Sequence, residues 1–591
     1  MATAGSAMML GRLAPQARAG IDPEFAHHVA PTDHEDNVFL HSVASGDPLP
    51  NGVIIWTRVT PTTEAVPGSE LGPDVPVRWE VSTDPEFSAI AAAGTEKATI
   101  ATDHTVKVDV TGLEPATTYF YRFHAEVPAE TAPDGHAPDV RTTTSTSPLG
   151  RTRTAPATHT ELDSVRFGVC SCANYESGYF QVYREMAQRD DLEFVIHLGD
   201  YTYEYEQGGY PGLYQTSPRQ VRPQHKTTTL QDYRVRQGLY HEDPDLAALH
   251  AAKPMICMWD DHEFADNNWR EGATASSFDK DQDYAALKAA ASRAYFEWMP
   301  VRVDPDAGAE HLYRRLQYGQ LMDLIIPDLR TYRDAQLIRT GDHLLDTDPD
   351  FARAAGDPDR TMLGNTQLEW FRDAVSTSPA QWQIIANAVM FSPLTIPPGI
   401  NPKLQDWLID TVGLPGDGVG LNMDQWDGYM AERQEIIDLI GDTPDRNVVF
   451  LTGDIHSSWA SDIPRDVRAY RNGQNFDSVA TEFIAPAITA NGPFSALARH
   501  EALHEPARAI IDEGENLLRA VDHWFKWIDL RFNGYMAVEV NKRGTQCDWH
   551  FVENVLTPDT PFWLEKSFSV QPGNPGPRPV AHGLDRGATV Y

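Results

Sequence analysis

The 591 residues of the chain include 85 acidic and 48 basic side chains, which gives a formal net charge of −37. An electrostatic field of this sign repels nucleic acids and anionic membranes, so we expect no sequence-specific nucleic-acid binding. No apolar run approaches the roughly 20 residues that a membrane span requires, so we expect no transmembrane segment. The length predicts two or three domains. An anionic ligand would need a local cationic site, and metal ions supply one compactly.

Residues 1–36 are predicted to be a leader or a disordered tail. Ala17-Arg18-Ala19 resembles the end of a signal peptide, but no twin arginine and no full apolar core precede it. A truncated export signal, a cloning remnant and a disordered tail are all compatible with this stretch. We expect the natural protein to be exported.

Residues 37–145 show short β-type runs separated by turn residues, which predicts a β-sandwich. Val53–Arg58 is a β-branched and aromatic run, and Thr105–Val110 alternates polar and apolar residues. Leu113–Phe123 resembles the turn and strand of fibronectin-type sandwiches, in which a tyrosine bonds to the backbone at a corner. The Thr-, Ser- and Pro-rich stretch that follows predicts a linker at 146–162.

From 163 to 570 apolar runs alternate with helical patterns, which predicts an α/β domain. The strand-like runs are Val165–Val169, Phe194–Leu198, Pro254–Trp259, Leu321–Ile326, Trp382–Val389 and Asn447–Leu451. The helix-like segments are Phe180–Gln188, Tyr284–Trp298, Asp424–Ile440 and Glu501–Trp527. Residues 571–591, rich in Pro and Gly, are predicted to be an extended or disordered tail.

Potential metal ligands follow four of these runs. Ser171-Cys172 comes after the first, Asp200 and Tyr203 after the second, Asp260–Glu263 after the third, and Asp454-Ile455-His456 after the last. Each has an ordinary alternative, such as a turn residue, a helix cap, a structural histidine or a buried thiol. Because ligands bind at the carboxyl ends of strands in α/β sheets, their joint arrival there predicts a metal site.

These motifs resemble the calcineurin-like metallophosphoesterases and, among them, the PhoD family of alkaline phosphatases and phosphodiesterases. Gly199-Asp200 with Tyr203 matches G-D-x-x-Y, and Asp260–Glu263 takes the place of G-N-H-E. Gly453–His456 replaces G-H-x-H, and Ser171-Cys172 replaces D-x-H. All three replacements depart from the superfamily pattern and resemble PhoD. The resemblance covers nearly the whole chain. It implies a four-layer metallophosphoesterase sandwich, with helices on two packed mixed β-sheets, behind a fibronectin- or Ig-like sandwich.

The resemblance implies a centre of one ferric ion and one or two calcium ions. Iron would be bound by Cys172, Asp200, Tyr203 and His456. Asp200 would bridge to calcium, which Asp261 and Asp454 would also bind. Thiolate and phenolate suit Fe³⁺, and carboxylates suit calcium. Asp260 is left either in a supporting position or on another calcium.

We expect hydrolysis of phosphate mono- or diesters by metal-activated water or hydroxide, because no Ser or Thr nucleophile motif is evident near these ligands. Asp200, Asp261 and His456 would act through the metals. Arg330, Arg333 and Asn267 are candidates to contact phosphate oxygens, although the arginines could instead pair with Asp328 or Asp334.

His262 could orient Asp261 or lie near the leaving group. A phospholipase D-type phosphodiesterase is the alternative enzyme, and a non-catalytic calcium-binding surface protein is the more distant one. The resemblance favours a secreted, periplasmic or cell-surface protein, exported folded by the twin-arginine route. The sequence does not determine the oligomeric state.

Overall fold

The computed structural model describes residues 37–128, 142–212, 215–274, 283–303, 311–337, 353–397, 416–443, 446–492 and 504–585, together with positions 403, 407, 409 and 411. The predicted leader at 1–36 and the last six residues lie outside these ranges. No helix in the described part is long and apolar enough to cross a membrane.

The amino-terminal strands are β1 (Val43–Leu49), β2 (Gly52–Arg58), β3 (Val75–Ser82), β4 (Ile90–Ala98), β5 (Thr105–Thr111), β6 (Thr118–Pro128), β7 (Thr142–Thr146) and β8 (Gly150–Arg153). The remaining strands are β9 (Ser164–Cys170), β10 (Val195–His197), β11 (Met255–Cys257), β12 (Arg314–Tyr318), β13 (Met322–Ile326), β14 (Trp382–Asn387), β15 (Thr395–Ile396), β16 (Val419–Gly420), β17 (Val448–Thr452), β18 (Ser458–Pro464), β19 (Ser478–Ile484), β20 (Phe525–Asp529), β21 (Gly534–Asn541), β22 (Gly544–Val552), β23 (Phe562–Gln571) and β24 (Asn574–Pro579). The α-helices are α2 (Gln181–Ala187), α3 (Leu230–His241), α4 (Pro244–Ala252), α5 (Tyr284–Trp298), α7 (Asn365–Thr377), α9 (Met430–Asp442), α10 (Val467–Arg471) and α12 (His504–Val521), and short 3₁₀ helices lie at Ile100–Thr102 and Trp426–Gly428.

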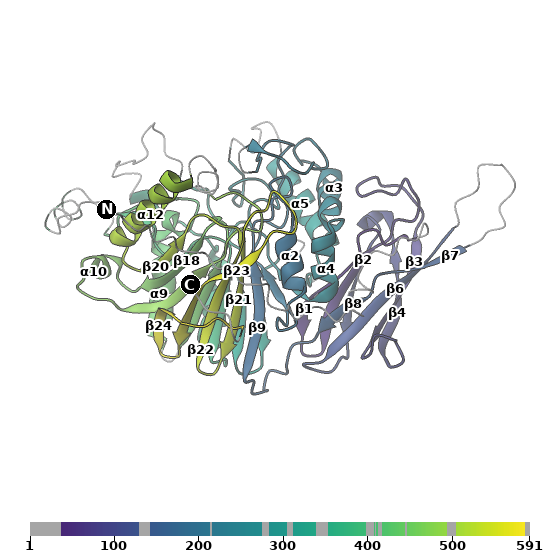
Figure 1. The fold of residues 1–591 in the computed structure, drawn as a ribbon, viewed down its shortest axis with the longest axis horizontal. Coiled ribbons are helices and arrows are strands. Elements are labelled where there is room, and N and C mark those ends of the chain that lie inside the picture. Colours follow the sequence, from purple (N-terminus) through teal and green to yellow (C-terminus); the bar gives the residue numbers. More distant parts are fainter. Residues whose placement is uncertain are drawn as a thin grey trace, which may run out of the picture.

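Two large mixed sheets form the body of the molecule (Figure 1). Among the described residues, one sheet has the order β24-β23-β22-β21-β9-β10-β11-β1-β2-β5, and the other has the order β12-β13-β14-β17-β19-β18-β20. The Trp549 indole on β22 donates to the carbonyl of Ile484 on β19 at 3.0 Å. The Trp382 indole on β14 donates to the carbonyl of Asn541 on β21 at 2.9 Å. The two sheets therefore contact each other directly.

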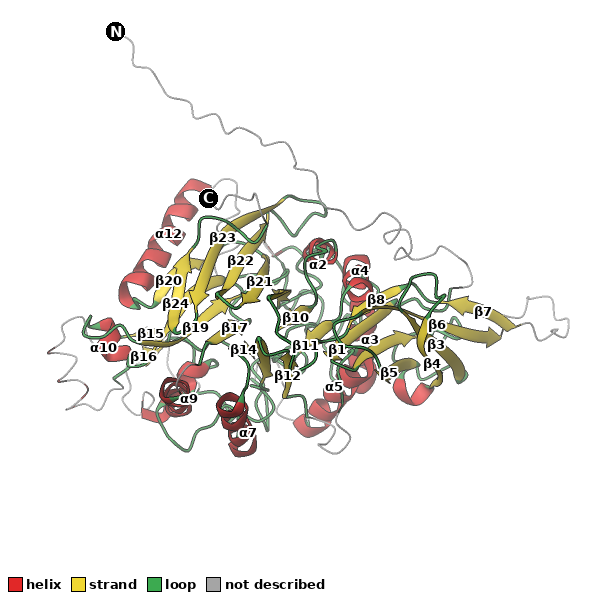
Figure 2. Ribbon diagram, turned by 90° about the horizontal axis from the view of Figure 1, so that it is seen from below, coloured by secondary structure: helices red, strands yellow, loops and turns green. Residues whose placement is uncertain are grey.

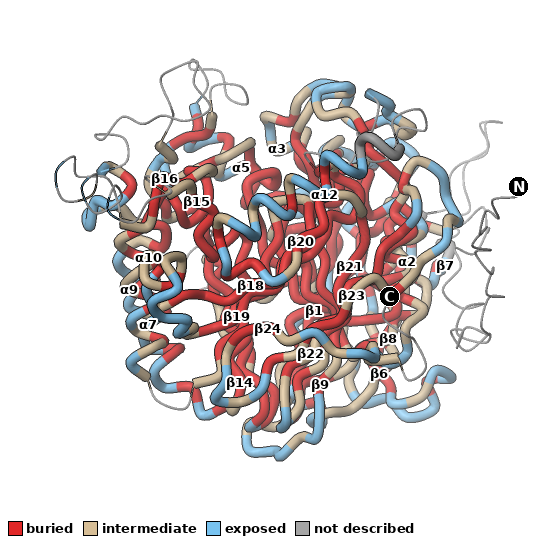
Figure 3. The backbone as a smooth tube through the Cα atoms, turned by 60° about the vertical axis from the view of Figure 1, so that its left-hand side comes forward, coloured by how far each residue is buried: buried red, intermediate tan, exposed pale blue. Residues whose placement is uncertain are grey.

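Helices pack on both sheets, as Figure 2 shows, with α7 and α9 beside the sheet that contains β14 and β17. Figure 3 shows that the buried residues are concentrated in the central strands. The parallel strands β9, β10 and β11 have almost wholly buried residues. This burial explains why their sequences are continuous apolar runs and not alternating patterns.

The amino-terminal strands are divided between two sheets. β1, β2 and β5 continue the large sheet, and β4-β3-β6-β7, with β8 on β6, form a separate one. One buried cluster unites them, with Val53 and Val108 from the first and Val77 and Phe123 from the second. The predicted tyrosine corner is confirmed, because the Glu114 amide donates to the Tyr119 hydroxyl at 2.9 Å.

Glycine allows the junction between β1 and β11. Gly46 pairs with Met255 in parallel register. A Cβ at Gly46 would lie 2.5 Å from the Met255 carbonyl oxygen and 2.3 Å from that of Pro300. Only a residue without a side chain permits this approach.

Four segments differ from the sequence prediction. The predicted linker at 146–162 includes strand β8, and the predicted tail includes strand β24 at the sheet edge. The helix predicted from Asp424 begins only at Met430. The helix predicted for Glu501–Trp527 ends at Val521, and β20 follows it.

Candidate metal centre

The predicted ligands lie on short loops at the carboxyl ends of β9, β10, β11 and β17. Backbone hydrogen bonds join the first two loops, from the Cys172 amide to the Gly199 carbonyl at 3.2 Å and from the Ala173 amide to the Asp200 carbonyl at 2.9 Å. Gly199 has φ +103°, and a Cβ there would lie 2.6 Å from the Asp260 amide nitrogen. The glycine of the G-D-x-x-Y motif thus lets the loops after β10 and β11 pack together.

Five residues of these loops have left-handed backbone conformations. They are Cys172 (φ 61°), Asp200 (φ 55°), Asn267 (φ 53°), Asp454 (φ 64°) and His456 (φ 53°). Non-glycine residues rarely adopt this region, and such conformations cluster at functional sites because the surrounding structure must impose them.

One group of side chains combines four kinds of donor. Potential ligand atoms of Cys172, Asp200 and His456 all lie within 4.8 Å of one another. The Tyr203 hydroxyl donates to Asp200 Oδ2 at 2.9 Å and lies 3.3 Å from His456 Nε2. The structure thus brings together the four residues that the family resemblance assigns to iron.

A second group contains only carboxylates. Oxygen atoms of Asp260, Asp261 and Asp454 lie within 4.8 Å of one another, and Asp200 forms a further group with Asp261 and His262. Asp200 thus lies close to Cys172 and His456 on one side and to Asp261, a member of the carboxylate group, on the other. Asp260 Oδ2 and Asp261 Oδ1 are buried and make no hydrogen bond with any described residue.

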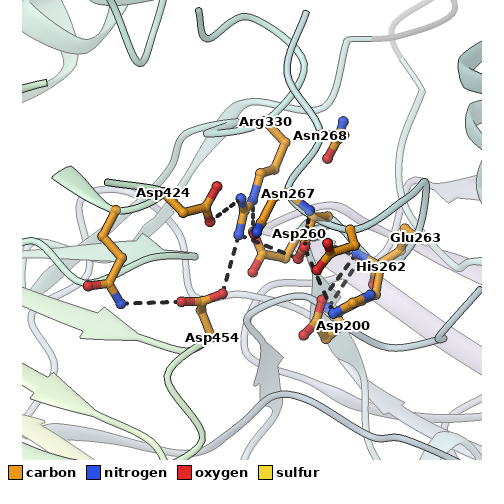
Figure 4. A network of polar contacts seen from close by, with 12 residues as sticks. Asp200, Asp260, His262, Glu263, Asn267, Asn268, Arg330, Asp424 and Asp454 are labelled. Atoms are coloured by element: carbon orange, nitrogen blue, oxygen red, sulfur yellow. Dashed lines mark hydrogen bonds and ion pairs between the residues drawn. The ribbon is translucent and has the colours of Figure 1, made fainter. Parts of the chain in front are cut away.

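Arg330 lies among the carboxylates of the second group and is 0% exposed (Figure 4). Its Nε pairs with Asp260 Oδ1 and its Nη1 with Asp424 Oδ2 at 2.6 Å. Its Nη2 lies 3.3 Å from Asp454 Oδ1 and 3.4 Å from Asp261 Oδ1. These ion pairs differ from the Asp328 and Asp334 partners that the sequence suggested for an arginine here.

Asp424, Gln425 and Arg333 complete this side of the centre. Arg333 Nη2 pairs with Asp424 Oδ1 at 2.5 Å, and the Gln425 amide donates to Asp454 Oδ2 at 3.3 Å. The Asn267 backbone amide donates to Asp261 Oδ2 at 2.7 Å. From the sequence, this segment is predicted only as the start of a helix, and Asp424 and Gln425 are assigned no role at the centre. The acidic side chain of Asp424 is the one signal that the sequence offers here.

Two buried glutamates support the loops, and sequence reasoning assigned neither of them a role. Glu263 accepts hydrogen bonds from the backbone amides of Asp200 at 3.1 Å, Tyr201 at 2.6 Å and Asp260 at 2.8 Å. Glu204 Oε2 lies 2.9 Å from His262 Nδ1, and the His262 ring stacks on Tyr203 with centroids 4.3 Å apart. His262 Nε2 lies 3.8 Å from Asp261 Oδ2.

The protonation equilibria are typical of buried acids crowded together. Burial raises the pKa of Asp200 well above its usual range, that of Asp260 to about 7 and that of Asp454 to about 6. Burial alone would raise the pKa of Asp261 as well, but the Arg330 guanidinium and His262 hold that pKa well below its usual range. Burial also lowers the pKa of His456 to about 4, which keeps the imidazole neutral.

A cation bound among these carboxylates would favour their ionised forms. The thiol of Cys172 and the phenol of Tyr203 respond to a bound cation in the same way. Burial and the nearby Asp200 raise the pKa values of Cys172 and Tyr203 well above their usual ranges. A bound metal ion would hold both side chains deprotonated, because coordination offsets the cost of a buried negative charge. The donor set therefore fits a metal centre.

Comparison with known proteins decides the family. Residues 167–549 match the family model described as PhoD-like phosphatase, and residues 25–156 match that of the PhoD-like phosphatase N-terminal domain. The chain belongs to the PhoD-like phosphatases. It is 33% identical over 553 residues to alkaline phosphatase D of Bacillus subtilis (strain 168). The aligned region covers 92% of this chain and 82% of that protein.

A solved structure described as the structure of PhoD is similar at a TM-score of 0.75 and 30% identity, with 95% of each chain covered. The predicted family membership is thus confirmed. This PhoD-like chain is a phosphoric ester hydrolase.

Proposed function

We propose that this phosphatase hydrolyses phosphate esters at a centre of one ferric ion and one or two calcium ions. Iron is assigned to Cys172, Asp200, Tyr203 and His456. Calcium is assigned to Asp200, Asp261 and Asp454. The observation that carries the proposal is the convergence of a thiol, a phenol, an imidazole and buried carboxylates within one cluster. Thiolate and phenolate ligands together suit Fe³⁺, and an all-oxygen group suits calcium.

When bound, these ions would neutralise phosphate oxygens and activate the attacking water or hydroxide. The chain's own residues hold and orient the ligands. Glu263 fixes the backbone that carries Asp200 and Asp260. Because Asp260 Oδ1 already pairs with Arg330, we place Asp260 in a supporting position, although its other oxygen is free for a second calcium ion.

Arg330 and Asn267 are proposed to contact phosphate oxygens. Both lie against Asp261, Arg330 through its guanidinium and Asn267 through its backbone amide. A guanidinium offers two parallel N–H donors to a phosphate. Arg333 is less suited to this role, because its Nε and both Nη atoms bond to Asn268 and Asp424 at 2.8 Å or less. Among the described residues, Arg330 Nη2 has only longer contacts, at 3.3 Å to Asp454 and 3.4 Å to Asp261.

The direct test compares hydrolysis of an aryl phosphate monoester and the matching diester at alkaline pH by wild type and Asp200→Asn. We expect the variant to lose at least about 100-fold in kcat, because removing a carboxylate that bridges two metals removes transition-state stabilisation of roughly 3 kcal/mol or more. Asp373→Asn, an exposed change on α7, is the matched control.

The ratio of the two esters ranks the phosphatase against the alternative, a phospholipase D-type phosphodiesterase. A wild type loaded with iron and calcium that is inert on both esters would instead support the non-catalytic calcium-binding reading. Normal turnover by Asp200→Asn would contradict the bridging role.

The iron assignment has its own test. A ferric ion bound by Tyr203 and Cys172 should absorb visible light by charge transfer. Cys172→Ser preserves the volume of a side chain that is 1% exposed and removes the thiolate, so its absorption should change while the protein stays folded. A colourless, fully active wild type with two zinc ions would contradict the iron assignment and leave the hydrolase intact.

We also propose the finer architecture and the location. The contacting sheets with helices on both support a four-layer metallophosphoesterase sandwich at 163–570. The shared core of the amino-terminal strands and the Tyr119 corner support a fibronectin- or Ig-like sandwich at 37–145. Export, folded, by the twin-arginine route rests on the family resemblance. Fractionation of the source cells would test it, and activity confined to the cytoplasm would contradict it.

A further inference from the structure

His456 makes polar contacts on both sides of its ring. Nε2 faces the Tyr203 hydroxyl at 3.3 Å, on the side of Cys172 and Asp200. Nδ1 faces away, 3.0 Å from the backbone carbonyl oxygen of Asn491 and 3.2 Å from the Tyr210 hydroxyl. The Tyr210 hydroxyl also donates to the Asn491 carbonyl at 3.3 Å.

The donors and acceptors in this triangle admit one arrangement. A carbonyl oxygen only accepts, so the short Nδ1–O contact requires the proton to be on Nδ1. Nδ1–H then donates to the Asn491 carbonyl, with the Tyr210 oxygen as a second acceptor, and the Tyr210 hydroxyl gives its own proton to the same carbonyl. In a neutral imidazole Nε2 is then the bare nitrogen, which is the form that binds a metal.

We propose that Tyr210 is a positioning residue that, with the Asn491 carbonyl, holds His456 in the Nδ1-protonated tautomer and aims Nε2 at the metal. The inference rests on the proposed iron assignment of His456. Such partners of a ligating histidine fix its ring orientation and strengthen it as a ligand.

The surrounding loops hold the Tyr210 hydroxyl in place. The Tyr210 backbone amide donates to Glu176 Oε1 at 3.1 Å, and its carbonyl accepts from the Asn174 amide at 2.9 Å. The Asn491 side-chain amide donates to the Pro211 carbonyl at 3.0 Å. The Tyr210 backbone is therefore tied to the loop of Asn174 and Glu176, and the Asn491 side chain is tied to the loop of Tyr210.

The test is Tyr210→Phe, which removes only the hydroxyl and keeps the ring packed near Tyr203 and Tyr205, at centroid distances of 5.9 and 5.7 Å. The matched control is Tyr179→Phe. Tyr179 is also half-buried, and its hydroxyl makes no hydrogen bond within the described part of the chain. Both variants are prepared as the iron- and calcium-loaded enzyme.

We expect Tyr210→Phe to lose iron to a chelator about 10-fold faster than wild type, as loss of such a partner typically costs 10- to 100-fold in metal affinity. Its visible charge-transfer band should shift, and its unfolding temperature should stay that of Tyr179→Phe. Iron loss and absorption equal to wild type would overturn the inference. Changes that appear only together with a lowered unfolding temperature would overturn it as well, because the role would then be structural.

A failure of the proposed iron centre can be distinguished from a failure of this inference. A wild type that retains no iron and shows no visible band would overturn the iron assignment, and this inference with it. A coloured wild type with an unaffected Tyr210→Phe variant overturns this inference alone.

Discussion

Glu263→Gln should loosen the loops that carry the metal ligands. In the structure Glu263 Oε2 accepts the amides of Asp200 and Asp260, and Oε1 accepts that of Tyr201. A glutamine can place its oxygen where Oε2 accepts the amides of Asp200 and Asp260. Its NH₂ group then faces the Tyr201 amide, and two hydrogen-bond donors cannot bond to each other. One buried N–H is left unpaired, and the other two bonds lose their charge.

The unpaired N–H costs about 1–3 kcal/mol, and the change from charged to neutral acceptor costs about 1 kcal/mol for each of the other two bonds. The sum, roughly 3–5 kcal/mol, is a large fraction of the 5–15 kcal/mol that typically stabilises a folded domain. If this energy is lost from the free energy of local opening of the loop, hydrogen exchange of the Tyr201 amide should accelerate about a hundred- to several-thousand-fold, because each 1.4 kcal/mol is a factor of ten.

The assay is hydrogen exchange followed by mass spectrometry at pH 9. Burial raises the pKa of Glu263 to about 8, so the carboxylate is ionised in that buffer. Glu482→Gln is the matched control, because Glu482 is also fully buried and accepts the backbone amides of Phe391 and Ser392 at 2.8 and 2.7 Å. It should speed exchange at those amides only. Unchanged exchange at Tyr201 in Glu263→Gln would refute the reasoning.

Three further predictions concern charge. Arg330→Met leaves the carboxylates around it without their buried partner, so it should lower the free energy of unfolding by about 3–5 kcal/mol. Calcium should raise the unfolding temperature of this variant more than that of wild type. A variant as stable as wild type in the absence of calcium would contradict this prediction. Chelation should abolish activity, which Ca²⁺ should restore in a turnover assay; recovery with Zn²⁺ alone would count against the division of ligands. Burial lowers the pKa of His197 and of His250 to about 3, so both imidazoles are neutral in the folded protein. Their contribution to the free energy of unfolding is present above pH 6.5, the usual pKa of an unfolded histidine, and is lost as the pH falls, by about 2 kcal/mol each at pH 5. His197→Gln should reduce this pH dependence in denaturation measured at pH 7 and 5, and an unaltered slope would contradict the assignment.

The central strands of the two large sheets could be predicted because they are buried on both faces. Such strands are continuous apolar runs, and the sequence shows these runs at β9, β10, β11 and β17. The ligands follow from the same logic, because polar side chains collect at the carboxyl ends of parallel strands. They come from two sheets, however, since β9, β10 and β11 belong to one and β17 to the other, and the packing of the two sheets brings Asp454 close to Asp261.

The errors have local physical causes. Trp426 and Met430 have helical spacing, but a Cβ at Gly428 would lie 2.2 Å from the Met423 carbonyl oxygen, and the segment forms a 3₁₀ turn. Pro and Gly in the carboxyl-terminal stretch predicted an extended or disordered tail. Residues 574–579 are extended, but the sequence did not indicate that they pair as β24 at a sheet edge, where a proline's missing N–H costs no ladder bond.

The supporting residues of the site could not have been predicted in the same way. Glu204, Glu263 and Tyr210 act through partners far away in sequence or across a loop, and nothing in their spacing indicates which atoms they contact. Their roles depend on how the loops fold back on one another. A single sequence carries no direct record of that geometry.

The large sheet runs without interruption from the carboxyl-terminal strands through β9, β10 and β11 into β1, β2 and β5. The two segments matched by separate family models, 25–156 and 167–549, therefore share one hydrogen-bonded ladder. Cutting the gene between them would bare the edge of β11 on one product and of β1 on the other. Such open edges promote self-association, so each fragment made alone should precipitate, while the two co-expressed should reassemble.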